Sequence, residues 1–241
     1  MSYKQRAKSV GMAKKKIKGH FLINLPFEFT DKQKEVIETI ADKDTTCVFV
    51  KGSAGTGKSH LAVYSGLQEL LAGNCQRLIY IRSAVESAHS KLGYLKGQIE
   101  DKFGPYAQIL NDKLSEMLTE QEIASLNMEN KIEAMPVSFL RGKDFKNTFI
   151  IVDECQSIYD SELKTIISRV GKDSKIVFLF DPKQSDITDA KHKQDVVRFS
   201  NIFKTEEAQS FGIHYREFTN EDIMRSPFCK FVMEQLEKAD F

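Results

Sequence analysis

Residues 52–59 of this 241-residue chain read Gly52-Ser53-Ala54-Gly55-Thr56-Gly57-Lys58-Ser59. An apolar run at residues 46–51 precedes this stretch with the pattern of a β-strand, and an apolar-rich run at residues 60–71 follows it with the pattern of a helix. A glycine-rich turn between a strand and a helix directs backbone N–H groups toward one point, where they surround a phosphate group. The sequence therefore predicts a phosphate-binding loop.

Each part of this loop has an expected role in binding ATP. Lys58 supplies a positive charge for the β- and γ-phosphates, and the hydroxyl of Ser59 is a ligand for Mg²⁺. Gly52 and Gly57 let the backbone turn tightly and approach the phosphates. The alternative is a glycine-rich turn before an ordinary helix, which the strand and helix patterns on either side disfavour. We expect all eight residues of the loop to contact ATP.

A second motif follows the unbroken apolar run at residues 148–152, which has the pattern of a parallel strand buried on both faces. Asp153 ends this run, where its carboxylate can hold Mg²⁺ together with Ser59. Glu154 comes directly afterwards and can polarise a water for attack on the γ-phosphate. The alternative is a surface glutamate that caps the next helix. The adjacent acids favour a hydrolase over a nucleotide kinase, because a kinase takes its nucleophile from the substrate.

Two glutamines are further candidates. Gln184 lies just past another apolar run, at residues 175–180, and can sense the γ-phosphate, or it can be an ordinary loop amide. Gln33 completes a Thr30-x-x-Gln33 capping box at the start of a predicted helix, so its side chain already has an expected local role.

The pattern along the rest of the chain alternates strands with helices, which predicts an α/β fold with a parallel sheet and helices on both faces. Further strands are expected at residues 76–82, 131–135, 137–140 and 212–219, and further helices at residues 160–170, 196–204 and 227–238. Residues 84–130 read as an inserted helical lobe with breaks at Gly93, Gly97 and Gly104-Pro105. We expect a flexible basic arm at residues 1–20 and a single domain at residues 21–241.

Composition and charge narrow the class of protein. The arm holds seven lysines and arginines and no acidic residue, although the whole chain has a net charge of only +1. Such an arm is expected either to attract nucleic acid or to act as a solubilising tail. The four cysteines are widely spaced, so neither a zinc site nor a disulfide framework is indicated. No apolar run approaches the ~18 residues of a membrane span, and we expect a cytoplasmic protein without membrane contact.

Three more segments carry a resemblance to a known family. Residues 82–97 read Arg-Ser-Ala-Val-Glu-Ser-Ala-His-Ser-Lys-Leu-Gly-Tyr-Leu-Lys-Gly, residues 139–142 read Phe-Leu-Arg-Gly, and residues 222–227 read Asp-Ile-Met-Arg-Ser-Pro. Together with the phosphate-binding loop and residues 152–156, they resemble the PhoH-like ATPases, P-loop NTPases related to the superfamily 1 helicase core. The resemblance extends over about residues 25–238, in the family's order.

The resemblance implies an ATP- and Mg²⁺-dependent phosphohydrolase that is helicase-like and acts on RNA. It also implies that Gln33 reads adenine, that Gln184 senses the γ-phosphate, and that Arg225 contacts phosphate within the chain or across a subunit boundary. Cys155, Phe180 and Ser83 depart from the family pattern, in which Ala, Gly and Pro are usual. We expect the metal site to tolerate the first two.

The resemblance also suggests where partners bind. A basic cluster with one stacking-capable ring follows the second predicted strand and is a candidate for binding single-stranded RNA or DNA: Arg82, His89, Lys91, Tyr94 and Lys96. The alternative is a solvated helical lobe with Tyr94 in its local core. The sequence has room for one ATPase core, so we expect a homo-oligomer, for instance a hexamer, in which Arg141 or Arg225 completes a neighbour's site. A rival function is an ATP-dependent conformational switch in assembly, without helicase activity.

Overall fold

In the computed structural model, six parallel strands form one sheet in the order β3-β2-β4-β5-β1-β6. The structure describes residues 23–24, 28–83, 99–140 and 142–224, and also residues 228, 230–232 and 235 near the C-terminus. The strands are β1 (Cys47–Lys51), β2 (Arg77–Arg82), β3 (Ile132–Pro136), β4 (Thr148–Asp153), β5 (Lys175–Phe180) and β6 (Ile213–Glu217). The predicted parallel α/β sheet is confirmed.

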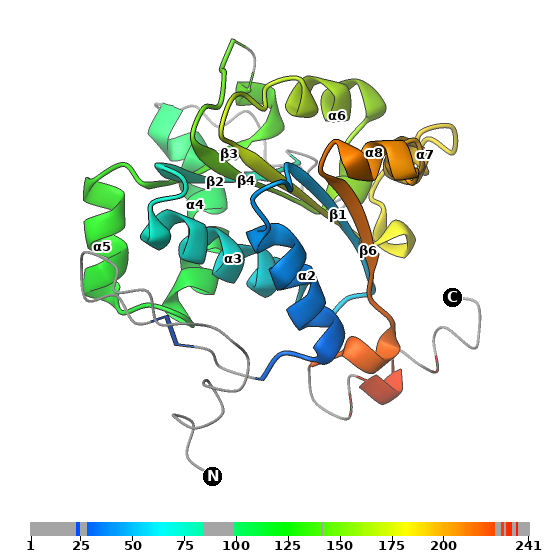
Figure 1. Ribbon diagram of the computed structural model, residues 1–241, viewed down its shortest axis with the longest axis horizontal. Coiled ribbons are helices and arrows are strands. Elements are labelled where there is room, and N and C mark those ends of the chain that lie inside the picture. Colours follow the sequence, from blue (N-terminus) through cyan, green and yellow to red (C-terminus); the bar gives the residue numbers. More distant parts are fainter. Residues whose placement is uncertain are drawn as a thin grey trace.

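Helices cover both faces of this sheet (Figure 1). One face carries α2 (Asp31–Ala41), α3 (Lys58–Ala72), α4 (Ile99–Ser115) and α5 (Glu120–Met128); the other carries α6 (Asp160–Ile167) and α7 (Asp195–Asn201), while α8 (Glu206–Ser210) lies beside β6. Alternate residues of β4 enter the two cores: Phe149 and Ile151 pack with the first group of helices, Ile150 and Val152 with the second. All four are fully buried, as the unbroken apolar run predicts.

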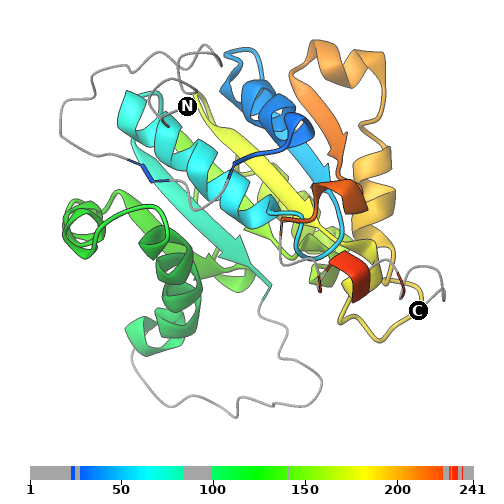
Figure 2. The same cartoon turned by 90° about the horizontal axis from the view of Figure 1, so that it is seen from below.

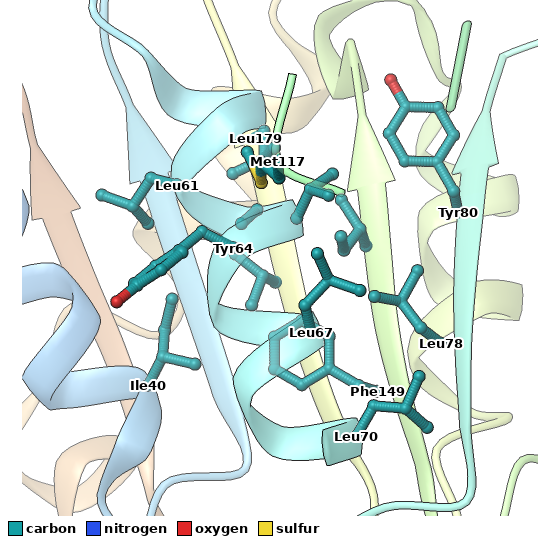
Figure 3. Close-up of a cluster of buried hydrophobic side chains, with 14 of the residues drawn as sticks. Ile40, Leu61, Tyr64, Leu67, Leu70, Leu78, Tyr80, Met117, Phe149 and Leu179 are labelled. Carbon is teal, nitrogen blue, oxygen red and sulfur yellow. The ribbon is translucent and has the colours of Figure 1, made fainter. Parts of the chain in front are cut away.

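Helix α3 lies directly on the sheet, because a glycine allows close contact. Figure 3 shows Leu67 of this helix beside Leu78 of β2 and Phe149 of β4. A Cβ atom at Gly66 would lie 2.6 Å from the Leu78 Cδ1 atom and 2.8 Å from the Phe149 Cδ1 atom. This close contact packs the middle of α3 against β2 and β4.

The helical insertion shares this core. Leu110 and Leu114 of α4 and Leu126 of α5 are buried in the same cluster as the residues of α3. The break predicted at Gly104-Pro105 is wrong, because α4 continues through both residues. An interior proline costs a helix about 3 kcal/mol, and we attribute the continuity to the buried leucines that follow.

Other boundaries also differ from the prediction. The strand expected at residues 137–140 is wrong, because Pro136 ends β3 and Val137–Phe139 form a 3₁₀ turn. Proline has no N–H for the strand ladder, which explains the change. Helix α8 has no counterpart among the predicted elements. The breaks at Gly93 and Gly97 lie outside the described residues, as do the arm at 1–20 and most of the helix expected at 227–238. Among the described residues, no helix is long and apolar enough to cross a membrane.

Candidate functional site

Three neighbouring strands end at one edge of the sheet, and the predicted phosphate chemistry follows each of them. Strand β5 pairs with β1 on one side and with β4 on the other. The phosphate-binding loop follows β1, Glu154 follows β4 and Asp181 follows β5. Figure 2 shows the strand arrowheads pointing to this common edge. The topology therefore brings segments that lie far apart in the sequence to one place.

The loop between β1 and α3 has the backbone that its glycines allow. Gly55 and Gly57 have φ angles of +84° and +75°, in the left-handed region where side chains are disfavoured. A Cβ atom at Gly52 would lie 2.9 Å from the Cβ atom of Phe218. Helix α3 begins at Lys58 with Gly57 as its N-cap and without a capping side chain. The first N–H groups of α3 thus have no capping side chain, as a phosphate-binding helix start requires.

Lys58 lies among three carboxylates. Its ammonium group donates hydrogen bonds to the carbonyl oxygens of Gly52 at 2.6 Å and Ser53 at 2.9 Å. Burial lowers the pKa of Lys58, and the negative charges of Asp181, Asp153 and Glu154 oppose this effect, in that order of size. The ammonium group of Lys58 and these three carboxylates therefore lie at the same edge of the sheet, where β1, β4 and β5 end.

Asp153 is hydrogen-bonded through its carboxylate to a side chain of the neighbouring strand β2. It is 3% exposed, and one of its oxygens accepts a hydrogen bond from the hydroxyl of Tyr80 on β2. Its other oxygen accepts from the backbone N–H of Glu154 at 3.0 Å. Burial, followed by the charge of Asp153, raises the pKa of Tyr80 far above its usual value, so the phenol remains a donor. A buried, oriented carboxylate oxygen suits Mg²⁺, which prefers oxygen ligands.

Glu154 has an uncommon backbone and two side-chain partners. Its φ and ψ angles are 55° and 43°, left-handed values that a non-glycine residue rarely adopts. One carboxylate oxygen lies 3.7 Å from a guanidinium nitrogen of Arg82, and the other accepts a hydrogen bond from the amide of Gln156. The side chain makes no capping hydrogen bond to the 3₁₀ turn Cys155–Ser157 that follows. The geometry thus gives no support to Glu154 as a helix cap.

The sequence patterns assigned no role to Gln156, which connects two strand ends. It is 2% exposed, its amide oxygen accepts from the backbone N–H of Asp181 at 3.1 Å, and its amide nitrogen donates to Glu154. The same nitrogen lies 3.4 Å from the backbone oxygen of Gln184 in the turn Pro182–Gln184. The backbone of Gln184 therefore lies near Glu154, the candidate base, while the Gln184 side chain is exposed.

Gln33 caps helix α2 and contacts the phosphate-binding loop. Its amide oxygen accepts from the Thr30 backbone N–H at 2.9 Å, which completes the predicted capping box. Its amide nitrogen donates to the backbone oxygen of Thr56 at 2.9 Å and to that of Asp222 at 3.3 Å. The side chain is fully buried. Recognition of adenine by Gln33 stays a prediction, and it would require the amide to exchange one of these partners.

Several predicted residues lie outside the described part of the chain. These are Arg141 and Arg225, and, in the candidate nucleic-acid cluster, His89, Lys91, Tyr94 and Lys96. Arg82 of that cluster is described, and it ends β2 directly beside Glu154.

Comparison with known proteins assigns the family. The PhoH-like protein family matches residues 28–237. A PhoH-like protein of a Synechocystis species is 34% identical over 88% of this chain, and one of Bacillus subtilis is 30% identical over 86%. The chain spans 62% and 63% of the length of these two relatives.

The fold agrees with a solved structure of another protein. The large terminase from a thermophilic bacteriophage superposes with a TM-score of 0.54 over 87% of this chain and 50% of the terminase, at 13% sequence identity. This likeness shows the fold, a parallel α/β sheet with helices on both faces. With the family match over most of its length, the chain belongs to the PhoH-like protein family.

Proposed function

We propose that this protein is a Mg²⁺-dependent ATP hydrolase whose turnover is coupled to single-stranded nucleic acid. The observation that carries the proposal is the convergence of Lys58 with the carboxylates of Asp181, Asp153 and Glu154 at the ends of three adjacent parallel strands. An ammonium group beside a phosphate-binding helix start serves a polyphosphate. The acids next to it suit a metal ion and an attacking water.

The nucleotide is held by residues 52–59. Their backbone N–H groups and Lys58 bind the phosphates, and the left-handed glycines let the backbone approach them. Ser59 and Asp153 hold Mg²⁺, with Tyr80 keeping the Asp153 carboxylate in place. When bound, Mg²⁺ neutralises charge that develops on the phosphate oxygens.

Glu154 polarises the attacking water. It follows β4 directly, at the same edge of the sheet as the end of β1 and the phosphate-binding loop. Gln184 senses the γ-phosphate, since its turn is tied to Glu154 through Gln156. Arg225 completes the phosphate contacts, either within the chain or in a cytoplasmic homo-oligomer.

Coupling to nucleic acid is supported by the position of Arg82. It is a partly exposed cation at the same sheet edge as the ATP site, and it begins the basic run that continues to Lys96. Single strands are bound by such charges together with stacking rings. The basic arm at residues 1–20 adds sequence-independent attraction.

The test is the ATPase rate of the purified chain with and without single-stranded RNA and single-stranded DNA. The Lys58→Ala variant sets the background, because it removes the charge that binds the phosphates. We expect Mg²⁺-dependent hydrolysis that Lys58→Ala abolishes and that single strands stimulate severalfold. Hydrolysis that is equally fast in Lys58→Ala would contradict the assigned site, and a flat response to both polymers would reduce the proposal to an ATPase without nucleic-acid coupling.

A second candidate is an ATP-dependent conformational switch that hydrolyses slowly. The observation in its favour is that both carboxylate oxygens of Glu154 have protein partners. Such a protein would bind ATP tightly, turn over slowly and show no response to nucleic acid in the same assay.

A further inference from the structure

The carboxylate of Glu154 is engaged at both oxygens, by one side chain from strand β2 and by one from the turn that follows β4. Oε1 lies 3.7 Å from Nη2 of Arg82 at the end of β2. Oε2 accepts a hydrogen bond from Nε2 of Gln156, just past the end of β4. A base that activates water must present an oxygen to that water. In this arrangement each oxygen already has a protein partner, and the two partners together fix how the carboxylate is turned toward such a water.

The two partners differ in how easily they can leave. Gln156 is buried and held by Asp181 and the Gln184 backbone as well as by Glu154. The Arg82 side chain is 33% exposed, and its ion pair with Glu154, whose side chain is 38% exposed, is long. Exposed ion pairs of this kind contribute little stability and exchange readily. Arg82 is therefore the releasable partner of the two.

Arg82 is also the one member of the predicted nucleic-acid cluster that lies in the described part of the chain. It is the last residue of β2 and stands opposite Asp153 in the register between β2 and β4. The next residue, Ser83, donates a hydrogen bond of 2.9 Å to the backbone oxygen of Ser157, in the turn that follows Glu154. The end of β2 is thus tied to Glu154 through an ion pair and to the turn that follows Glu154 through a hydrogen bond.

We propose that Arg82 is a positioning residue that restrains Glu154 until a nucleic-acid phosphate takes its guanidinium. Guanidinium groups bind phosphate in the same bidentate manner as carboxylate, so a backbone phosphate can replace Glu154 as the anion beside Arg82. Release frees the Glu154 carboxylate to turn toward a water at the γ-phosphate. Nucleic acid then stimulates hydrolysis by removing a restraint at the end of β2. This inference rests on the proposed function and assigns one residue to its regulation.

The test compares steady-state ATPase rates of the wild-type chain with those of Arg82→Gln and Arg82→Lys, each with and without oligo(dT) and poly(U). Arg77→Gln is the matched control, because Arg77 begins the same strand at the opposite edge of the sheet and is exposed. The midpoint of thermal unfolding is measured for each variant, so that a folding defect is recognised.

We expect Arg82→Gln to raise the basal rate about two- to fivefold, the range that loss of an exposed ion pair allows. The KM for ATP should stay at the wild-type value, and single strands should stimulate this variant little further. Arg82→Lys keeps the charge and should return the basal rate toward wild type. Arg77→Gln should match wild type throughout.

A residue that only contacts phosphate gives a different result. Its loss lowers the stimulation by nucleic acid and leaves the basal rate unchanged. If Arg82→Gln behaves in this way while the wild-type chain is stimulated, the restraint by Arg82 is overturned and the proposed function is not. A basal rate that falls in Arg82→Gln would also overturn it. A wild-type chain that hydrolyses ATP without any response to either polymer would instead overturn the proposed coupling to nucleic acid, and the role of Arg82 in it.

Discussion

The hydroxyl of Tyr80 donates a hydrogen bond to the carboxylate of Asp153 across the β2–β4 pair, and both side chains are buried. Figure 3 shows this hydroxyl directed toward the arrowhead end of the two strands. The contact places a neutral donor behind the carboxylate that we assign to Mg²⁺. Tyr80 thereby orients the Asp153 carboxylate, the proposed Mg²⁺ ligand.

The first prediction concerns Tyr80→Phe. Partners of this kind typically change metal affinity by about 10- to 100-fold, so the Mg²⁺ concentration for half-maximal ATPase activity should rise at least about tenfold. The maximal rate should change less, because Glu154 and Lys58 are untouched. A Mg²⁺ titration of activity measures the effect. Tyr64→Phe is the control, since Tyr64 is also buried but its hydroxyl accepts from Gln68. An unchanged Mg²⁺ requirement in Tyr80→Phe would argue against Asp153 as a metal ligand.

The second prediction concerns the junction between α2 and the loop. Gln33→Ala leaves the Thr30 N–H and the Thr56 carbonyl without this side chain, and should lower the free energy of unfolding by about 1–3 kcal/mol. If Gln33 also reads adenine, the ratio of the KM values for GTP and ATP should fall toward one. Thr30→Ala removes the capping oxygen and the hydrogen bond that the same hydroxyl donates to buried Asp222, and should cost about 1–3 kcal/mol without changing this ratio. Stability at the wild-type level in Gln33→Ala would contradict the buried contacts.

The third prediction concerns the packing of α3 on the sheet. Gly66→Ala places a methyl group against Leu78 and Phe149, and overpacking of this kind costs about 1–3 kcal/mol of folding free energy. Gly104→Ala is the matched control in α4, where an added Cβ atom meets nothing within 4 Å. Because Pro105 follows directly and disfavours a Cβ atom on the residue before it, the gain in helix propensity is offset and the stability should change by less than about 1 kcal/mol. Urea unfolding gives the free energy of unfolding of both variants. Equal values for the two would contradict the close packing of α3 against the sheet.

The fourth prediction concerns the charge of Lys58. Burial lowers the pKa of this lysine, and Asp181 is the largest influence that opposes the effect. Asp181→Asn removes that opposition and should lower the pKa further, so the positive charge is lost at a lower pH. The affinity for a fluorescent ATP analogue should therefore decline at a lower pH in the variant than in the wild type. A decline at the same pH would show that Asp181 does not influence Lys58.

The sequence was sufficient for the parts of this site that follow from local pattern. The glycine-rich stretch predicts its own backbone, the apolar run before Asp153 predicts a buried strand, and the parallel sheet brings both to one edge. The contacts of Tyr80 with Asp153 and of Arg82 with Glu154 were not predictable in this way, because they depend on β2 lying next to β4 in a particular register. The role of Gln156 was not predicted for a similar reason. Its partners Glu154 and Asp181 follow β4 and β5, and these two strand ends become neighbours only through the order of strands in the sheet.

Glu154 is the proposed base that activates the attacking water, and single-turnover hydrolysis by Glu154→Gln tests this role most directly. Glutamine keeps the size of the side chain and removes the base, so ATP binding should stay within a fewfold of wild type while the rate of hydrolysis falls at least about 100-fold. Glu133→Gln is the control. Glu133 lies on edge strand β3 and forms an exposed ion pair with Lys143, so this variant should hydrolyse ATP at the wild-type rate. Hydrolysis by Glu154→Gln at close to the wild-type rate, with ATP bound equally well, would contradict the account.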